Sequence, residues 1–286
     1  MKALIYGNLT IDKNITESGN YTGPGGSAYF ASQTLTNFHY PNIIISPYGQ
    51  DFQKKFIDKL NIYPTHHTGK TTLIFHNEIK NNKRFQKIEG LKYSQNIPLA
   101  QIPDKIFSGV NLIMLCSILD NLPLENIKLL RSKVSAQCLF VFIAQGLFRK
   151  IGKDNEIILS DGHHLTKYLP LVDIISLSDE DTPDASQKAS RWSRGGPLVI
   201  ITKDSQGCVL FENGKEKKFP AYIPSKIIDS TGAGDIFAAS FAYAKLKSKS
   251  NIYAARIGNS TASLSLSQRP IHLQFTHSDV VRQIGH

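Results

Sequence analysis

The sequence predicts an α/β protein with a doubly wound, mostly parallel sheet and a small β-lid. The main observation is an alternation of apolar, strand-like runs with helical segments, which is clearest after residue 100. Strands that alternate with helices favour a parallel sheet, because each crossover returns the chain in the same direction. A second observation is that two strand-like segments, at about 9–22 and 67–93, break this alternation. We expect them to pair as a lid over the active-site crevice; a plain surface hairpin is the alternative.

The expected elements follow one another along the chain. Apolar runs predict buried strands at residues 3–6, 43–45, 112–115, 139–143, 174–177 and 198–202. Helical patterns occupy residues 124–133, 184–194 and 251–267. Residues 208–219 predict a hairpin at the sheet edge, because the Asn-Gly pair at 213–214 favours a tight turn. The sequence has no internal repeat or linker, so we expect a single domain over residues 1–286.

The composition limits the classes of partner. Of 286 residues, 41% are hydrophobic, which is enough for a sizeable core. The formal charge of +10 suits a small anionic substrate, and the Lys and Arg residues are too scattered for a nucleic-acid surface. We find no membrane-spanning run and no signal-peptide pattern. Cys116, Cys138 and Cys208 are widely spaced, as in buried thiols of a reducing compartment, so we expect a cytoplasmic protein with no nucleic-acid or membrane partner.

The segment from Asp229 to Asp235 carries the strongest chemical signal. It reads Asp-Ser-Thr-Gly-Ala-Gly-Asp and is followed by an apolar, helical stretch. Glycines let backbone N–H groups converge at a helix N-terminus, where they form an anion site. A carboxylate beside a bound anion suggests a base that deprotonates an alcohol during phosphoryl transfer. The alternative is an ordinary loop whose Asp is favoured by the helix dipole.

Three other motifs accompany this segment. Gly23-Pro24-Gly25-Gly26 predicts a second glycine turn that opens a helix. Asp12 lies beyond the first strand, where open α/β sheets bind their ligands. The third motif, Thr202 to Gly207, is a strand that runs into a polar turn.

With these motifs in this order, the sequence resembles the ribokinase-like (PfkB) family of carbohydrate and nucleoside kinases. The family signature Asp-Thr-x-Gly-Ala-Gly-Asp differs from residues 229–235 only at Ser230. Gly25-Gly26 matches the N-terminal Gly-Gly element of the family. The resemblance covers nearly the whole chain and implies a ribokinase-like three-layer fold.

The resemblance also implies roles for individual residues. Asp235 would be the catalytic base, and Gly232, Ala233 and Gly234 would form the anion hole for the γ-phosphate. The acceptor would be held by Asp12, Gly25 and Gly26, and Arg84 of the lid is a further candidate for contact with acceptor or phosphate.

ATP is the phosphate donor that the resemblance implies. Thr202, Ser205 and Gly207 match the nucleotide turn of the family, with Lys203 where a glycine is usual. Asn259 and Ser263 would line the adenine pocket.

The same resemblance implies two metal ions. Ser178 and Asp181 stand where the family usually has an Asn-x-x-Glu element, and Asp181 would order Mg²⁺ through water. A solvated acidic helix start is the alternative for this stretch. Asp229 and Thr231 resemble ligands of the monovalent cation, K⁺, that activates many family members; the alternative is that they only brace the turn.

A further element resembles a subgroup that includes inositol kinase-like proteins. Gln145-Gly146 and Arg149 match its Gln-Gly-x-x-Arg pattern, although Ile143 replaces the Asp that usually opens it. Arg149 would reach the crevice, and a surface Arg is the alternative. Tyr29 and Phe30 replace an Asn that many members have, which argues against a close match to ribokinase itself.

The leading hypothesis is therefore an ATP-dependent kinase that phosphorylates a hydroxyl of a small sugar or polyol. The alternatives are a nucleoside kinase and a non-catalytic binder of sugar and nucleotide on the same fold. A nucleotide-dependent oxidoreductase is disfavoured, because no Gly-x-Gly-x-x-Gly follows the first strand. A lid strand could pair with a second lid, which would give a homodimer.

Overall fold

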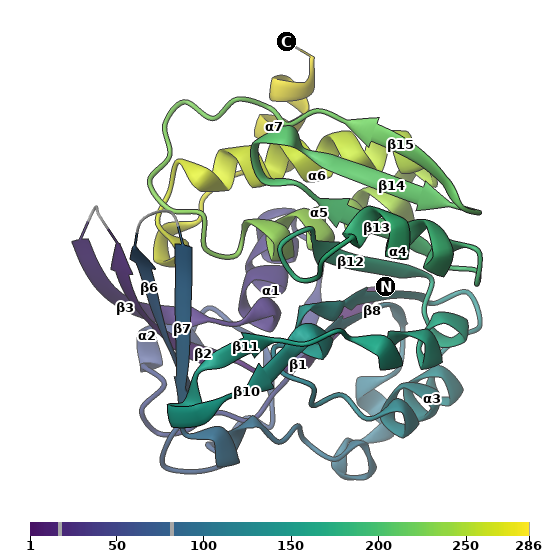
Figure 1. Ribbon diagram of the computed structural model, residues 1–286. Helices are drawn as coiled ribbons and strands as arrows, with labels where there is room; N and C mark the ends of the chain where they lie inside the picture. Colours follow the sequence, from purple (N-terminus) through teal and green to yellow (C-terminus); the bar gives the residue numbers. More distant parts are fainter. Residues whose placement is uncertain (17–18, 81–82, 286) are drawn as a thin grey trace.

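A long, mostly parallel sheet runs through the computed structural model, which describes residues 1–16, 19–80 and 83–285 (Figure 1). Its strands lie in the order β15-β14-β13-β12-β9-β8-β1-β4-β5. The neighbours from β13 to β5 pair in parallel, and β14 and β15 add an antiparallel edge. The strands are β1 (Lys2–Gly7), β4 (Asn42–Ile45), β5 (Ile62–Tyr63), β8 (Val110–Cys116), β9 (Leu139–Ile143), β12 (Ile174–Ser178), β13 (Leu198–Thr202), β14 (Cys208–Glu212) and β15 (Lys215–Phe219). The predicted doubly wound sheet is confirmed.

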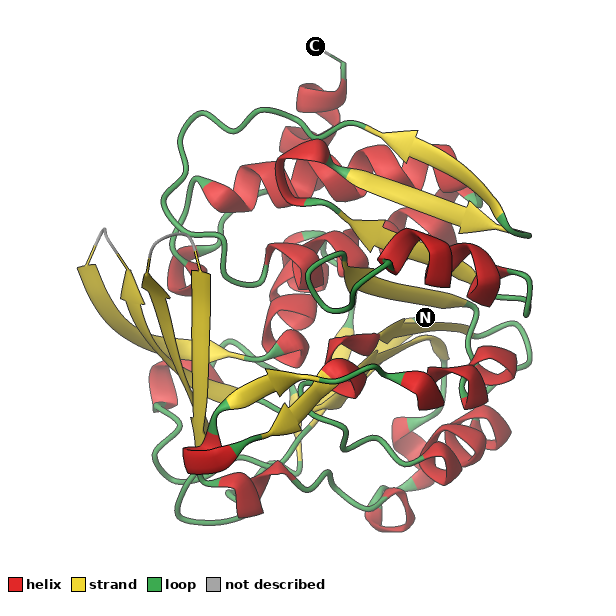
Figure 2. Ribbon diagram, viewed as in Figure 1, coloured by secondary structure: helices red, strands yellow, loops and turns green. Residues whose placement is uncertain are grey.

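Helices cover both faces of this sheet, so the fold has three layers (Figures 1 and 2). Alternate strand residues point to opposite faces. Ile5 and Met114 belong to one hydrophobic cluster, whereas Leu4 and Ile113 belong to the other. The first cluster includes residues of α1 (Ser27–Asn37), α5 (Ala233–Ser248), α6 (Asn251–Leu266) and α7 (His277–Ile284), with α2 (Lys54–Ile57) at its margin. The second includes residues of α3 (Leu124–Lys133) and α4 (Ala185–Ser193).

Helices α5 and α6 pack closely because small residues lie at their contact. A Cβ atom at Gly258 of α6 would lie 2.6 Å from the ring of Phe237 of α5. Phe237 and Phe241 are both buried, and the rest of α5 is rich in alanine. This dense layer holds the N-terminus of α5, and with it the glycine-rich signature, in a defined position.

The two segments that break the alternation form a separate sheet, seen at the left of Figure 1. Its order is β3-β2-β6-β7, with β2 and β6 parallel and the outer pairs antiparallel. Its strands are β2 (Thr10–Thr16), β3 (Gly19–Gly25), β6 (Leu73–Lys80) and β7 (Lys83–Glu89). The lid therefore extends beyond the predicted boundary at residue 22. Gly23 to Gly25, expected as a turn, continue β3, because the chain needs no turn before Gly26 opens α1.

A short hairpin that the sequence analysis did not predict braces the lid. It consists of β10 (Arg149–Ile151) and β11 (Ile157–Leu159), which lie beside the lid in Figure 2. Lys87 of β7 bridges to Glu156 over 3.5 Å, and the two residues also pair through their backbones. Strands this short give no readable period in the sequence.

The three cysteines are free and buried, as predicted. Burial raises the pKa of the Cys138 and Cys208 thiols to about 12 each. Within the described ranges, no helix has the length and apolar character needed to cross a membrane.

Neighbouring leucines of α3 provide a test of the core. Leu130 is fully buried against the sheet, whereas Leu129 is 38% exposed. We expect Leu130→Ala to lower the free energy of unfolding by about 2–5 kcal/mol, because it leaves a cavity. Leu129→Ala makes the same substitution at the neighbouring, exposed residue of α3, and it should lower the free energy of unfolding by less than about 1 kcal/mol. Denaturant unfolding of both variants measures the difference; equal losses would contradict the packing described.

Candidate active site

The predicted site residues gather at one edge of the main sheet, where its parallel strands end. Gly7, Cys116 and Ile143 are the last residues of β1, β8 and β9, which are neighbours in the sheet. A Cβ atom at Gly7 would lie 2.2 Å from the carbonyl oxygen of Cys116, so only glycine allows this close approach. Ligands of open α/β sheets bind outside such carboxyl ends.

The glycine turn before α5 rests on α1. Gly232 is the N-cap residue of α5 and has φ 79°, which is left-handed backbone that favours glycine. A Cβ atom there would lie 2.5 Å from the ring of Phe30. Ala233 and Gly234 then begin the helix, whose first N–H groups have no acceptor within it. The turn therefore leaves backbone N–H groups unpaired within the helix at residues 232–234, and their role as an anion hole stays a prediction.

Asp235 lies in the first turn of α5, close enough to Cys116 at the end of β8 to act on that thiol through its charge. Burial raises the pKa of the Cys116 thiol well above its usual range, and the negative charge of Asp235 raises it further. The Nε2 atom of Gln145 lies 3.4 Å from Asp235 Oδ1 and donates a 2.6 Å hydrogen bond to Ser27 Oγ. The base predicted on α5 is thereby connected to the start of α1.

Asp12 lies on the face of the lid that carries Thr10, whose hydroxyl donates to Asp12 Oδ1 over 2.6 Å. The carboxylate is 7% exposed. A Cβ atom at Gly25 would lie 2.1 Å from Asp12 Cγ, and Gly26 has φ 86°. The structure therefore brings Asp12 and the Gly-Gly element together, and both glycines are required by the packing itself.

The same face of the lid carries an amide row that the sequence analysis missed. Gln86 Nε2 donates to Asn77 Oδ1 over 2.7 Å, and Asn77 Nδ2 donates to Asn14 Oδ1 over 2.9 Å. Asn14 is only 3% exposed, and among the residues that the structure describes its Nδ2 atom has no hydrogen-bond partner. Strand alternation could have found Asn14, because it lies two residues from Asp12 and so shares its face.

Asp229 joins the lid to the glycine turn. The Tyr21 hydroxyl of β3 donates to Asp229 Oδ2 over 2.5 Å, and the Thr231 N–H donates to Oδ1 over 2.8 Å. Burial and this hydrogen bond to Asp229 raise the pKa of Tyr21, and the Arg269 guanidinium lies 5.9 Å from its ring centroid. The contact with Thr231 is the bracing role given above as the alternative to cation binding.

The nucleotide turn lies beside the anion site. A Cβ atom at Gly234 would find Thr202 Oγ1 as its nearest neighbour, at 4.0 Å. The Lys203 N–H donates to the Gly207 carbonyl over 2.7 Å, and Gly207 has φ 89°. Ser205 is exposed on the 3-10 turn between them. The turn keeps a tight shape although Lys203 replaces a glycine.

The two residues predicted to line the adenine pocket make contacts within the protein. Asn259 is 5% exposed and donates to the carbonyls of Phe219 and Pro220 over 3.1 and 2.9 Å. Ser263 is 3% exposed and accepts from Gln283 over 3.3 Å. These bonds hold α6 to its neighbours, and an adenine-binding role for either residue stays a prediction.

An acidic turn follows β12. The Asp181 Oδ2 atom accepts the Ser178 N–H over 2.8 Å, and the Asp179 N–H donates to the Thr202 carbonyl over 3.1 Å. The turn therefore lies beside the nucleotide turn, as the resemblance requires. Asp181 is half-buried, whereas Asp179 and Glu180 are exposed.

Two arginines complete the comparison with the predicted site. The side chain of Arg84 lies outside the described part of the structure. Arg149 is half-buried and donates to Gln145 Oε1 over 2.8 Å and to the Ile118 carbonyl over 3.1 Å. These two bonds hold the guanidinium beside Gln145, and a contact of Arg149 with substrate or phosphate stays a prediction.

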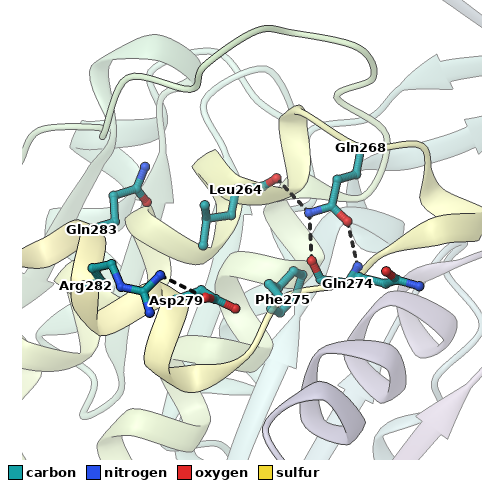
Figure 3. A pocket seen from close by; sticks show the side chains of 7 residues that line it. All are labelled: Leu264, Gln268, Gln274, Phe275, Asp279, Arg282 and Gln283. Atoms are coloured by element: carbon teal, nitrogen blue, oxygen red, sulfur yellow. Dashed lines mark hydrogen bonds and ion pairs between the residues drawn. The ribbon is translucent and has the colours of Figure 1, made fainter.

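A groove of about 420 Å³ lies elsewhere, between α6 and α7 (Figure 3). Its walls make bonds with each other, such as the Gln268 amide with the Gln274 backbone and Arg282 with Asp279. It contains none of the predicted catalytic residues, and it therefore does not enter the proposed mechanism.

Comparison with known proteins agrees with this geometry. The sequence model described as "pfkB family carbohydrate kinase" matches residues 168–271, which include the nucleotide turn and the whole glycine signature. This chain is similar to the ribokinase-like kinases of the pfkB family. The curated inositol 3-kinase of Zea mays is 26% identical to it over 94% of this chain and 73% of that protein.

Solved structures of ribokinase-family kinases share its fold. Arabidopsis thaliana ribokinase, solved with ribose and ATP, has a TM-score of 0.75 and 16% identity over 100% of this chain and 99% of that one. A pyrophosphate-dependent kinase of the ribokinase family, solved with a pyrophosphate analogue and myo-inositol, has a TM-score of 0.75 and 16% identity over 99% and 100% of the two chains. The predicted three-layer ribokinase-like fold is confirmed.

The two glycines of the signature should respond differently to alanine. Gly232 has φ 79°, and a Cβ atom there would clash with the Phe30 ring, whereas a Cβ atom at Gly234 would meet Thr202 Oγ1 at 4.0 Å, an ordinary contact. We expect Gly232→Ala to lower the free energy of unfolding by about 2 kcal/mol or more. Gly234→Ala, the matched control, should leave it unchanged to within about 1 kcal/mol. Thermal and denaturant unfolding measure both, and a Gly232→Ala variant as stable as Gly234→Ala would refute the packing of this turn on α1.

Proposed function

We propose that this protein transfers the γ-phosphoryl group of ATP to a hydroxyl of a small sugar or polyol. The observation that carries the proposal is the arrangement around Asp235. The carboxylate lies beside the anion turn, and Gln145 and Ser27 connect it to the start of α1, next to Gly25-Gly26 and Asp12. This arrangement supports a role for Asp235 as a base between bound phosphate and a bound alcohol.

The reaction follows from these positions. Asp12 and the backbone of Gly25 and Gly26 hold the acceptor. Asp235 takes the proton of the acceptor hydroxyl as its oxygen forms a bond to the γ-phosphorus and the bond to the β-phosphate oxygen breaks. The N–H groups at residues 232–234 stabilise the charge on the transferring group, and ADP and a phosphate ester leave. The lid excludes water, which would otherwise be phosphorylated in place of the acceptor.

Magnesium fits the acidic turn. Mg²⁺ is usually held by one or two carboxylates together with substrate phosphates and water. Asp181 has one oxygen engaged by the Ser178 N–H, and Asp179 and Glu180 supply exposed carboxylates beside it. The described residues contain no cluster of three or more acidic, His or Cys ligands, so the nucleotide phosphates would complete the coordination. The ion would neutralise charge on the β- and γ-phosphates.

The amide row favours an acceptor with several hydroxyls. Asn14, Asn77 and Gln86 provide donors and acceptors beside Asp12 on the lid face. Such a face can bind an inositol or a sugar, and the similarity to inositol 3-kinase agrees with this class. A nucleoside remains the second candidate, because a curated cytidine kinase of Thermococcus kodakarensis is 39% identical over 22% of this chain.

Pairing of two lids also remains a proposal. Ile15 and Phe85 lie on the outer face of the lid and are 48% and 53% exposed. Exposed apolar side chains on a sheet face favour association with another such face. Sedimentation of the purified protein would distinguish a monomer from a homodimer.

Removal of the base tests the reaction. We expect Asp235→Asn to lower kcat by about 10²–10⁴-fold, because the variant cannot accept the hydroxyl proton. A coupled ADP-release assay with myo-inositol, D-ribose and cytidine measures turnover, and calorimetry checks that ATP still binds. Asp58→Asn makes the same change at an exposed residue and should leave turnover unchanged. Full activity in Asp235→Asn would end the proposal.

The contacts of Asp229 generate an expectation for K⁺. Both of its oxygens already accept hydrogen bonds, from Tyr21 and from Thr231, and these bonds hold the turn without a cation. We expect turnover to change by less than about twofold when tetramethylammonium replaces K⁺ at equal ionic strength. Activation by K⁺ but not Na⁺ would contradict this and would favour the cation-binding role of Asp229 and Thr231.

A further inference from the structure

We propose that Gln145 is a positioning residue for Asp235, and that Arg149 sets the orientation of its amide. The inference rests on the proposed function, because it concerns the same base. It explains the Gln-Gly-x-x-Arg element of residues 145–149, which the proposed mechanism has not used.

The amide orientation of Gln145 follows from the chemistry of its neighbours. A guanidinium group can only donate hydrogen bonds, so the Gln145 atom that lies 2.8 Å from Arg149 Nη2 must be the carbonyl oxygen. The NH₂ group therefore points the other way, toward Ser27 Oγ at 2.6 Å and Asp235 Oδ1 at 3.4 Å. Arg149 is itself held by the Ile118 carbonyl over 3.1 Å. Arg149 thus fixes the Gln145 amide from the segment that follows β8, with the donor directed at Asp235.

The residue after Gln145 must be a glycine because the neighbouring chain leaves no room for a side chain. A Cβ atom at this position would lie 2.0 Å from Ser117 Oγ and 2.4 Å from the Leu119 carbonyl oxygen. The Gly146 N–H also donates to the Ser117 carbonyl over 3.1 Å. Only glycine lets the turn after β9 pack this closely against the chain that follows β8. In this element, Gly146 allows the close packing of the turn, Arg149 binds the Gln145 carbonyl, and the Gln145 NH₂ group points toward Asp235.

The 3.4 Å contact identifies what the amide does for the base. It is longer than an ordinary N–H···O bond, as catalytic hydrogen bonds often are before substrate binds. A donor on Oδ1 limits the rotation of the Asp235 carboxylate and fixes which oxygen meets the acceptor hydroxyl. Gln145 touches neither donor nor acceptor in this role, so its loss should slow turnover and leave substrate affinity nearly unchanged.

Two substitutions distinguish two contacts of Gln145, the one that its NH₂ group makes with Asp235 and the one that its carbonyl makes with Arg149. Gln145→Met keeps the length of the side chain and removes both polar ends. Gln145→Glu keeps an acceptor for Arg149 but turns a carboxylate, instead of a donor, toward Asp235. We expect both to lower kcat by about 10–100-fold, with the KM of acceptor and ATP within about threefold of wild type. Gln101→Met, at an exposed glutamine, is the control and should behave as wild type.

Arg149 supplies the conservative comparison. Arg149→Lys retains a cationic donor for the Gln145 carbonyl and should lose less kcat than Arg149→Leu. Kinetics with the best acceptor among myo-inositol, D-ribose and cytidine, together with thermal unfolding, measure the whole series. A Gln145→Glu variant with wild-type kcat would overturn the inference, and so would a raised acceptor KM with unchanged kcat, which would make Gln145 an acceptor ligand. If Asp235→Asn keeps its turnover in the same assay, the proposed function fails instead.

Discussion

The site depends on one contact, the packing of Gly232 on the ring of Phe30. It joins the two helices that glycines open, α1 and α5, at the carboxyl edge of the sheet. Because Gly232 has no Cβ and a left-handed backbone, the first turn of α5 can lie directly on α1. Asp235 then lies within reach of the segment that follows Gly26. A larger residue at 232 would separate the anion turn from the acceptor side.

The lid is held to this centre on two sides. On one edge, Tyr21 of β3 donates to Asp229, which precedes the glycine turn. On the other, Lys87 of β7 bridges to Glu156 of the segment between β10 and β11. The β10–β11 hairpin begins directly at Arg149, which orients Gln145. The lid and the residues around Asp235 are therefore parts of one connected set of contacts.

Most of the fold could be predicted from the sequence, because its signals are local. Apolar runs gave the strands of the main sheet, and the two segments that break the rhythm became the lid. The signature predicted Asp235 and the turn of residues 232–234 in the positions where they lie. The sequence analysis missed the roles of Tyr21 and the amide row of Asn14, and assigned Asn259 to a pocket although its amide binds two carbonyls of its own chain.

The sequence by itself determined the positions of the glycine turns and of the strands, since glycine positions and a two-residue period are properties of short segments. It also named the carboxylate at the anion turn. Only the tertiary structure decided which side chains meet it: Gln145 and Asp235 are 90 residues apart, and Tyr21 and Asp229 are 208 apart. Such pairs leave no local pattern, because their geometry exists only once the folded chain brings the strand ends of the main sheet and the lid strands together.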